Sequence, residues 1–570
     1  MNNSEEAYLL RVRFLLSVML FGFVGLFCAQ AYKQIFKNAY YLNLAKSQHF
    51  LAKELPAHRG EIYASSIYSK EPFLLAGNEK LFSLNLVPRQ ILDKEKTARK
   101  IAELANLKYE EVYEAINNNK PYIPPIKKDL TFKEAQNILK EELSGVYILP
   151  HDHRFYPYGS LLSAVLGYVD TEGKGNYGLE QYYDKELRGD SGFFMAEKDV
   201  YGRYININQE TPPKNGTNLF LTIELPIQFK AEEIIKQAVK DYAAEDGQII
   251  VLNPKTGAII AMAQSKTFNP ENYSKEAESR GISVFYNDVV SSLYEPGSIF
   301  KVVPALVALE KKVVEPSTLF DVEASIEVGG QRIWTALRQA EGRITFSRIL
   351  EHSNNVGIIK VQQMVGKEAF YEFLVNRFRF NLPLGIDLPN EMNAQFPSLS
   401  DFKDIEAATM SFGQGIAITP LQAASIFAAI ANDGVLMKPY IVGKKIDSQG
   451  NVETVEPKEI GRIVDKETAR KMRDILYSVV EEGYSGLAKV PGYKVGGKTG
   501  TAQVPSPQGG YDPNKTIHSF AGIFPLDDPQ FVILVKLDYP KAVQWAASSA
   551  APVFSKIASF IANYYQIPKK

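Results

Sequence analysis

The stretch Glu295-Pro296-Gly297-Ser298-Ile299-Phe300-Lys301 joins a turn to the start of a buried helix. Glu295-Pro296-Gly297 has the composition of a turn, and the run from Ile299 to Leu309 is apolar apart from Lys301. A turn that leads into such a run predicts a helix with Ser298 at its N-terminus. In helical phase Lys301 lies one turn after Ser298 on the same face, so its amine can reach the serine hydroxyl.

This pair has the chemistry of a nucleophile and its base. A serine hydroxyl is a weak nucleophile at neutral pH and needs a base within hydrogen-bond reach. A lysine amine can act as that base only when it is neutral, and burial and a nearby second cation both favour the neutral form. Because Phe300, Val302 and Val303 surround Lys301, it is not a typical surface lysine. We therefore predict that Ser298 is the nucleophile and Lys301 its base.

A second motif, Ser353-Asn354-Asn355, stands directly before the apolar segment Val356 to Val361. From that turn the Ser353 hydroxyl could relay a proton to a leaving group, while the Asn355 amide holds a substrate carbonyl or orients Lys301. The alternative is a helix cap, since Ser and Asn are favoured at that position.

A third motif, Lys498-Thr499-Gly500-Thr501, lies in the glycine-rich stretch Val495 to Ala502. Glycines weaken a strand but allow a ligand to approach its backbone closely. An extended peptide could add to this strand, with Lys498 and the hydroxyls of Thr499 and Thr501 meeting a terminal carboxylate. The backbone N–H groups of Ser298 and Thr501 could then form an oxyanion hole, and Lys498 could be the second cation near Lys301.

The first and third motifs each occur a second time, in an unsuitable context. Ser400-Asp401-Phe402-Lys403 lies in a polar loop with no apolar helix starting at its serine. Lys255-Thr256-Gly257 stands between two apolar runs, Gln248 to Leu252 and Ala258 to Met262, which predicts the turn of a β-hairpin. Neither is expected to take part in the chemistry.

Composition excludes several classes of function. The 64 basic and 65 acidic residues give a net charge of −1, so nucleic-acid binding is not expected. The single cysteine, Cys28, excludes disulfides within the chain and thiolate metal sites. His151-Asp152-His153 lacks a third nearby ligand, so we interpret it as part of a polar loop between domains and expect neither metal nor cofactor.

The N-terminal segment Phe14 to Tyr32 has 19 residues without a charge, which is enough to span a bilayer. We predict an uncleaved transmembrane anchor, because the run is longer than the usual signal-peptide core. The alternative is a cleaved signal peptide, since Ala29-Gln30-Ala31 has the small-x-small form of a cleavage site. Basic residues flank both ends, so they do not fix the orientation.

The pattern along the chain predicts three parts. Residues 1–33 form a tail and anchor, residues 34–215 a non-catalytic module with surface helices between Asp93 and Asn117, and residues 216–570 the catalytic region. The polar linker from Gln209 to Gly216 marks the last boundary. Beyond it we predict an α+β domain, in which an antiparallel sheet is flanked by helices and carries an inserted helical lobe. The expected elements are a hairpin around Lys255, helices at 346–364, 420–432, 466–482 and 551–565, and strands at 218–223, 493–503, 519–524 and 530–537.

The three motifs in this order resemble those of class B penicillin-binding proteins, the membrane-anchored peptidoglycan D,D-transpeptidases. The resemblance extends over nearly the whole chain, and the further motifs that carry it are His58 to Tyr63, Arg154 to Pro157, Gly178 to Gln181, Gly413 to Gly415, Thr419 to Gln422 and His518 to Gly522. Tyr294 to Ser298 and Ser353 to Gly357 are more similar to the septal, division-specific branch than to the elongation branch.

The resemblance implies a cross-linking reaction through a serine acyl-enzyme. It implies stem peptides ending in D-Ala-D-Ala as substrates, β-lactams as ligands, and a membrane glycosyltransferase and division or elongation proteins as partners. It also implies a single-pass protein of the cytoplasmic membrane with its catalytic domain on the outer side. The site residues that it implies are Ser298, Lys301, Ser353, Asn355 and Lys498, with Thr499, Gly500 and Thr501 for the carboxylate and oxyanion.

Three positions depart from the family pattern: Asn354 stands where the general motif has Asp, Asp288 where Arg is frequent, and Ile299 where Thr is usual. Two other functions remain open at this point. A β-lactamase-like hydrolase or D,D-carboxypeptidase would use the same acylation chemistry, but the sequence has no Glu-x-x-Leu-Asn segment to activate a deacylating water. A scaffold for wall synthesis would use mainly the module at 34–215.

Overall fold

The computed structural model of the chain describes residues 3–38, 40–41, 50–118, 123–198, 204–506 and 508–569. These residues form two compact units, of which the first contains Met1–His58 and Gly189–Asn215 and the second contains Arg59–Arg188 and Gly216–Lys570. The chain therefore passes between the units three times, and the last passage, at Asn215, falls in the linker where the sequence predicts a domain boundary.

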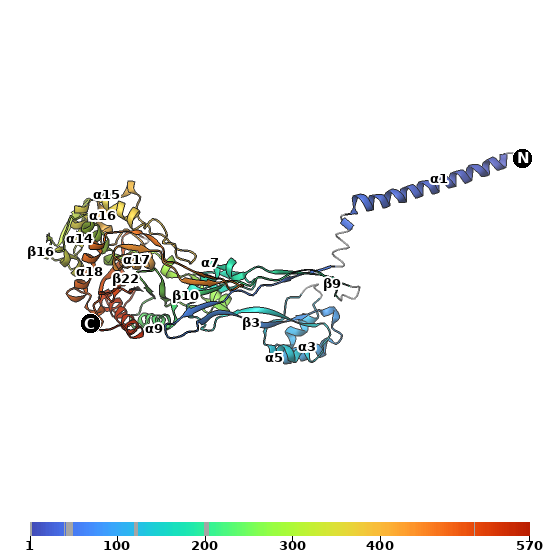
Figure 1. Ribbon diagram of the computed structural model, residues 1–570, viewed down its shortest axis with the longest axis horizontal. Coiled ribbons are helices and arrows are strands. Elements are labelled where there is room, and N and C mark those ends of the chain that lie inside the picture. Colours follow the sequence, from blue (N-terminus) through green and yellow to red (C-terminus); the bar gives the residue numbers. More distant parts are fainter. Residues whose placement is uncertain are drawn as a thin grey trace. The chain divides into compact units, whose positions relative to one another are not determined.

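The first unit contains a long apolar helix and a small sheet. The helix α1 spans Asn3–Ala31 and continues as a π-helical turn at Tyr32–Phe36 (Figure 1). Among the described residues, the segment Tyr8–Phe36 is the one helix long and apolar enough to cross a membrane, and it contains the predicted anchor. The sheet has the antiparallel order β1-β8-β9, with β1 at Phe50–Leu55, β8 at Gly192–Lys198 and β9 at Tyr204–Thr211.

The second unit begins with a sheet that joins sequence from both sides of residue 215. Its order is β19-β18-β10-β2-β3-β4, and β5 also pairs with β3. Strand β10, which follows the linker, pairs in parallel with β2, which lies far before it. The strands are β2 at Ile62–Ser65, β3 at Phe73–Leu86, β4 at Lys127–Leu130, β5 at Val146–Phe155, β10 at Asn218–Glu224, β18 at Val442–Ile446 and β19 at Val452–Thr454.

The predicted surface helices are present beside the C-terminal half of β3 (Figure 1). The region from Asp93 to Asn117 forms α3 at Lys94–Ala105 and α4 at Tyr109–Ile116, and α5 follows at Phe132–Leu139. The Asp93 carboxylate caps α3, and Asn106 ends it with a left-handed backbone. These helices bury their own small core, which is separate from the larger ones.

The interpretation of His151-Asp152-His153 as a loop between domains is wrong. These residues lie in the middle of β5, where Asp152 pairs with Lys80 of β3. The sequence hides this strand because its imidazole and charged side chains fall on both faces, with His151 and His153 on one face and Asp152 and Arg154 on the other, so no alternation of apolar and polar residues marks it.

Three motifs of the non-catalytic module meet at a buried cluster of charges. The Glu180 carboxylate, which is fully buried, accepts hydrogen bonds from Arg59 Nε at 2.6 Å and from Arg154 Nε at 2.8 Å. Arg154 also donates to the carbonyl of Gly60, and Tyr156 donates to the same carboxylate at 3.3 Å. Although burial raises it, the two guanidiniums bring the pKa of Glu180 below its ordinary value. The cluster fixes the start of β2, the end of β5 and the helix α7, Gly178–Tyr182, to one another.

The catalytic region is built on a five-stranded antiparallel sheet with the order β12-β11-β23-β22-β21, as the predicted α+β fold requires. Its strands are β11 at Asp246–Leu252, β12 at Ile259–Gln264, β21 at Gly496–Pro505, β22 at Tyr511–Phe524 and β23 at Phe531–Asp538. Strands β11 and β12 are the predicted hairpin around Lys255. Strand β21, which carries the third motif, lies at one edge of the sheet.

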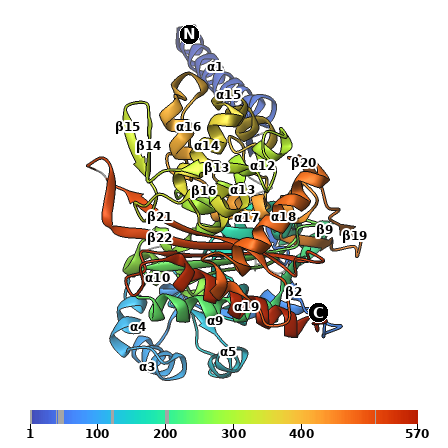
Figure 2. The ribbon, with the colours of Figure 1, turned by 90° about the vertical axis from the view of Figure 1, so that its left-hand side faces the viewer.

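Helices cover both faces of this sheet (Figure 2). The helices α9, Leu225–Asp241, and α19, Ala550–Tyr564, pack on one face, and α17, Pro420–Ala431, and α18, Lys466–Glu481, pack on the other. The inserted helical lobe contributes α12 at Val302–Glu310, α13 at Phe346–Glu351 and α14 at Asn355–Val365. All four predicted helical regions are present, and the first of them is divided at Ser353.

We expect the change of Glu180 to Gln to destabilise the second unit by roughly 3–5 kcal/mol, because it leaves two buried guanidiniums without their common counter-charge. Urea unfolding followed by circular dichroism measures the loss. The matched control is Arg188→Gln, since Arg188 is 59 % exposed and its pair with Asp184 should contribute less than about 1 kcal/mol. Equal stability of the two variants would contradict the importance of the buried cluster.

Candidate active site

The predicted nucleophile lies on a tight turn. Gly297–Lys301 form a 3-10 helix, and α12 continues from Val302, so Ser298 is at the start of a helix whose first turn is wound more tightly than predicted. The N–H of Gly297 donates to the carbonyl of Gly413 at 3.0 Å. A Cβ at Gly413 would lie 2.1 Å from the carbonyl oxygen of Gly297, so the contact requires glycine there. The motif around Gly413 therefore supports the nucleophile turn.

The third motif packs directly against this turn. A Cβ at Gly500 would lie 2.8 Å from the carbonyl oxygen of Pro296 and 2.6 Å from the Ser519 hydroxyl. Glycine at this position therefore lets β21 approach the backbone that precedes Ser298. Because β21 is an edge strand, its outer side has no neighbouring strand in the sheet.

One hydroxyl joins the three motifs. The Lys301 amine donates to the backbone carbonyl of Ser353 and, at 3.1 Å, to the Ser353 hydroxyl. The Lys498 amine donates to the same hydroxyl at 3.0 Å and to the carbonyl of Thr499 at 3.2 Å. The structure thus brings Lys301, Ser353 and Lys498 together, although they come from the 3-10 helix before α12, the turn before α14, and β21.

Both lysines are buried, with exposed fractions of 0 % for Lys301 and 1 % for Lys498. Burial, followed by the positive charge of Lys498, holds the pKa of Lys301 well below its ordinary value, and the carboxylate of Glu341 opposes this. Burial also lowers the pKa of Lys498 to about 7. Lys301 is therefore predisposed to the neutral form that a base requires.

Ser298 is partly exposed, in contrast to the two buried lysines. Within the described residues, the hydrogen bonds of the Lys301 amine go to Ser353 and not to Ser298. Catalytic hydrogen bonds are frequently loose in the absence of substrate, so this arrangement is compatible with a base for Ser298.

The three residues of the middle motif, Ser353 to Asn355, have different structural roles. The cap of α14 is Asn354, whose side-chain oxygen accepts from the N–H of Gly357 at 2.9 Å. The capping alternative considered for this motif thus applies to Asn354, while Ser353 is held in a left-handed backbone with φ of 54°. The amide of Asn355 donates to the carbonyl of Trp334 at 3.4 Å and makes no hydrogen bond with Lys301.

Both threonines of the third motif are partly exposed. The Thr501 hydroxyl accepts from the N–H of Ala546 at 3.1 Å, so its own proton remains available for a ligand. Next to it on β22, the buried His518 bonds Ser549 at 2.8 Å, and burial lowers the pKa of His518 to about 4.

Neither repeated motif is near this group. Lys255 is in the hairpin turn between β11 and β12, where it pairs with Asp528 at 2.9 Å on the surface. Ser400 lies in the short 3-10 helix Leu399–Asp401 and bonds Ser398.

Glu341, which lies just before β16, Gly342–Thr345, could not be predicted from the sequence. One of its carboxylate oxygens accepts from the Asn354 amide at 2.6 Å, and the other contacts the His352 ring at 2.6 Å. No motif signals this residue, because its contacts depend on how the loop before β16 folds back onto the turn at Ser353.

Asp288, one of the departures from the family pattern, belongs to a different cluster. Burial, and then the neighbouring carboxylate of Asp246, raise the pKa of Asp288 to about 7. The ammonium of Lys536 lies in the same region, 5.1 Å from the ring centre of Tyr294, and donates to Gln248 at 3.1 Å. Through Tyr294, this cluster adjoins the segment that leads to Ser298.

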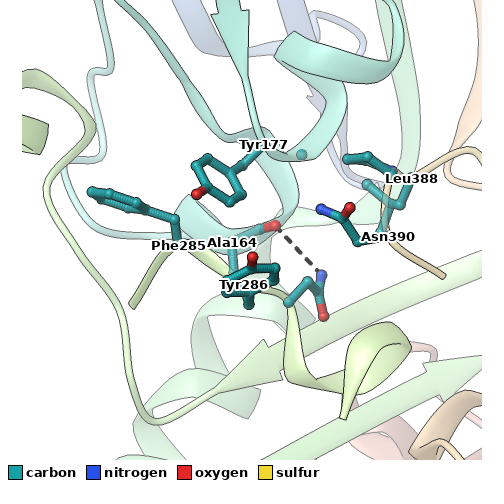
Figure 3. A pocket seen from close by; sticks show the side chains of 9 residues that line it. Ala164, Tyr177, Phe285, Tyr286, Leu388 and Asn390 are labelled. Carbon is teal, nitrogen blue, oxygen red and sulfur yellow. Dashed lines mark hydrogen bonds between the residues drawn. The ribbon is translucent and has the colours of Figure 1, made fainter. Parts of the chain in front are cut away.

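A small pocket lies beside Asn287, where its amide donates to the carbonyl of Ala164 (Figure 3). The rings of Tyr177, Phe285 and Tyr286 surround it. Gly178 of the motif Gly178 to Gln181 lines this pocket, but no residue of the three catalytic motifs does, so it is separate from the group around Ser353.

Comparisons with known proteins agree with this geometry. Residues 247–559 match the penicillin binding protein transpeptidase domain, and residues 54–221 match the penicillin-binding protein dimerisation domain. Stage V sporulation protein D of Bacillus subtilis is 33 % identical over 555 residues, covering 95 % of this chain and 84 % of the relative. Peptidoglycan D,D-transpeptidase FtsI of Escherichia coli is 31 % identical over 428 residues, covering 74 % and 69 %.

A solved structure is also similar. Penicillin binding protein 3 of Mycobacterium tuberculosis, in complex with aztreonam, superposes with a TM-score of 0.70 at 27 % identity and covers 91 % of this chain and 98 % of that one. The match to the transpeptidase domain alone spans more than half of the chain. The predicted resemblance is therefore confirmed. The chain belongs to the class B penicillin-binding proteins, the family of peptidoglycan D,D-transpeptidases.

Proposed function

We propose that this protein cross-links peptidoglycan stem peptides ending in D-Ala-D-Ala through an acyl-enzyme on Ser298. The observation that carries the proposal is the Ser353 hydroxyl, which accepts hydrogen bonds from the buried amines of both Lys301 and Lys498 beside the Ser298 turn. Two lysines of lowered pKa at one hydroxyl provide both a base and a proton path.

In the acylation step, the Ser298 oxygen attacks the carbonyl carbon between the two D-alanines, and neutral Lys301 takes the serine proton. The N–H groups of Ser298 and Thr501 stabilise the negative oxygen of the tetrahedral intermediate. As the peptide bond breaks, the leaving D-alanine amine receives a proton through the Ser353 hydroxyl, which is replenished from the lysine amines.

In the second step, the amine of another stem peptide attacks the ester, forms the cross-link and returns the proton to Ser298. Attack by water instead would make the protein a D,D-carboxypeptidase or a β-lactamase-like hydrolase. The absence of a Glu-x-x-Leu-Asn segment from the sequence favours the amine as acceptor.

The open edge of β21 suits an extended peptide, which can extend the sheet through its backbone. We propose that Lys498 and the hydroxyls of Thr499 and Thr501 bind the terminal carboxylate of the substrate and that Gly500 allows its close approach. Asn355 would hold a substrate carbonyl. The carboxylate of β-lactams would occupy the same position.

We propose a tail and anchor at residues 1–33, a dimerisation-type module at 34–215 and the transpeptidase domain at 216–570. The apolar helix α1 would hold the protein in the cytoplasmic membrane, with the catalytic domain on the outer side. Flanking charges do not oppose this orientation, because long domains translocate largely regardless of them. The motif at Tyr294 to Ser298 is similar to the septal branch, which favours a role in division. We propose a membrane glycosyltransferase and division or elongation proteins as its partners.

We expect penicillin to acylate Ser298 and no other residue, because Ser298 alone combines the turn, the helix start and Lys301. Mass spectrometry of the labelled protein identifies the modified residue. The change of Ser298 to Ala should abolish labelling, whereas Ser400→Ala, in the repeated motif, should leave it unchanged. A penicilloyl group on Ser353 or Ser400 would show that the assignment is wrong.

The change of Lys301 to Arg should lower the acylation rate by about 10² to 10⁴, the usual range for the loss of a general base, because arginine keeps the charge but cannot be deprotonated. Stopped-flow measurement with a chromogenic β-lactam gives the rate. The matched control is Lys255→Arg, since Lys255 is 54 % exposed in the repeated motif. A rate for Lys301→Arg within a few-fold of the unchanged protein would point to Ser353 as the base.

The anchor should remain on the mature protein, because its apolar run outlasts a signal-peptide core. We expect the protein to stay in the membrane fraction after washing with carbonate, and N-terminal sequencing to find residues before Phe14. A mature chain that starts at Tyr32, directly after Ala29-Gln30-Ala31, would identify the segment as a cleaved signal peptide.

A further inference from the structure

Glu341 contacts the residues on both sides of Ser353. Its two carboxylate oxygens each lie 2.6 Å from a partner, one from the Asn354 amide and the other from His352 Nδ1. The partners are themselves held, because Asn354 caps α14 through Gly357 and the ring of His352 stacks on Tyr484 with centres 5.4 Å apart. The carboxylate therefore bridges the end of α13 and the start of α14.

The residue between these two contacts needs such support. Ser353 has φ of 54°, a conformation that is unfavourable for a residue with a Cβ. A strained residue persists only where its surroundings fix it. Ser353 must also present its hydroxyl and its carbonyl to Lys301 at the same time, and its hydroxyl to Lys498.

We infer that Glu341 is a positioning residue for the proposed reaction: its carboxylate, through His352 and Asn354, holds the Ser353 hydroxyl between the amines of Lys301 and Lys498. The inference rests on the proposed function and adds a residue that lies outside the three motifs. Glu341 acts through its neighbours and is not expected to touch the substrate.

The charge of Glu341 has a second consequence. The charged groups that act on Lys301 are Lys498, which favours the neutral amine, and Glu341, which favours the ammonium. The rate of acylation should rise with pH as Lys301 loses its proton. Removing the carboxylate charge lowers the pKa of Lys301 further, so the rising limb should move to lower pH.

Two substitutions separate shape from charge. Glu341→Gln keeps the length of the side chain and a hydrogen bond to Asn354, and it should move the rising limb of acylation rate against pH to lower pH. Glu341→Ala removes both contacts and should slow acylation by about 10- to 100-fold at the pH optimum, as a misplaced catalytic group does. Stopped-flow acylation by a chromogenic β-lactam, on the full-length protein in detergent, gives both readouts.

The matched control is Glu327→Gln, on the neighbouring hairpin of β14, Ser325–Val328, and β15, Gln331–Trp334, where Glu327 is 65 % exposed. It should match the unchanged protein in rate and in pH profile. Because His352 faces Glu341, the Glu341→Gln comparison is repeated in a His352→Gln background, where the shift of the limb should persist.

The inference is overturned if Glu341→Ala acylates within two-fold of the unchanged protein, if the limb of Glu341→Gln does not move, or if its shift disappears in the His352→Gln background. Thermal unfolding of each variant reports whether it is folded. Should Glu341→Ala fail to fold, the pH limb of Glu341→Gln decides alone. Failure of the unchanged protein to be acylated would instead contradict the proposed function.

Discussion

The catalytic region depends on one hydroxyl that accepts from two buried ammonium or amine groups. Burying a lysine is costly because its charged form loses hydration, and placing two together adds repulsion. The pair at Lys301 and Lys498 is tolerable because each can lose its proton and because Ser353 offers oxygen acceptors to both. The same costs that make the arrangement unfavourable for stability lower the pKa values and make an amine available as a base.

Close backbone packing lets these groups meet. Gly413 admits the turn at Gly297, and Gly500 brings the edge strand β21 against Pro296. Each contact is too short for any Cβ, so the glycines fix the distance between the nucleophile turn and the strand that carries Lys498. The helix and the strand are thus placed by contacts of the main chain, which are less compliant than contacts between flexible side chains.

The sequence was sufficient to predict the family and most elements of the catalytic region, because the motifs and the apolar periodicity are local signals. It was insufficient where partners are distant. The pairing of β10 with β2 joins strands that lie on either side of the predicted boundary, and polar residues on both faces of β5 made the strand look like a loop. Glu341 was missed because a single acidic residue in a loop has no pattern until the fold brings it to Asn354.

The two buried charge clusters show how the same physics serves different ends. Around Glu180, opposite charges meet: its carboxylate lies between two guanidiniums, and Asp184 supplies a second carboxylate to Arg59. The result is a fixed junction of three segments. Around Ser353, two lysines meet, and the carboxylate of Glu341 offsets the effects on Lys301 only in part, since the pKa of Lys301 stays low despite it. A carboxylate paired closely with each lysine would stabilise the ammonium forms, and the proposed base would be lost. An acidic group held to one side of Ser353 can therefore support the turn without preventing the chemistry.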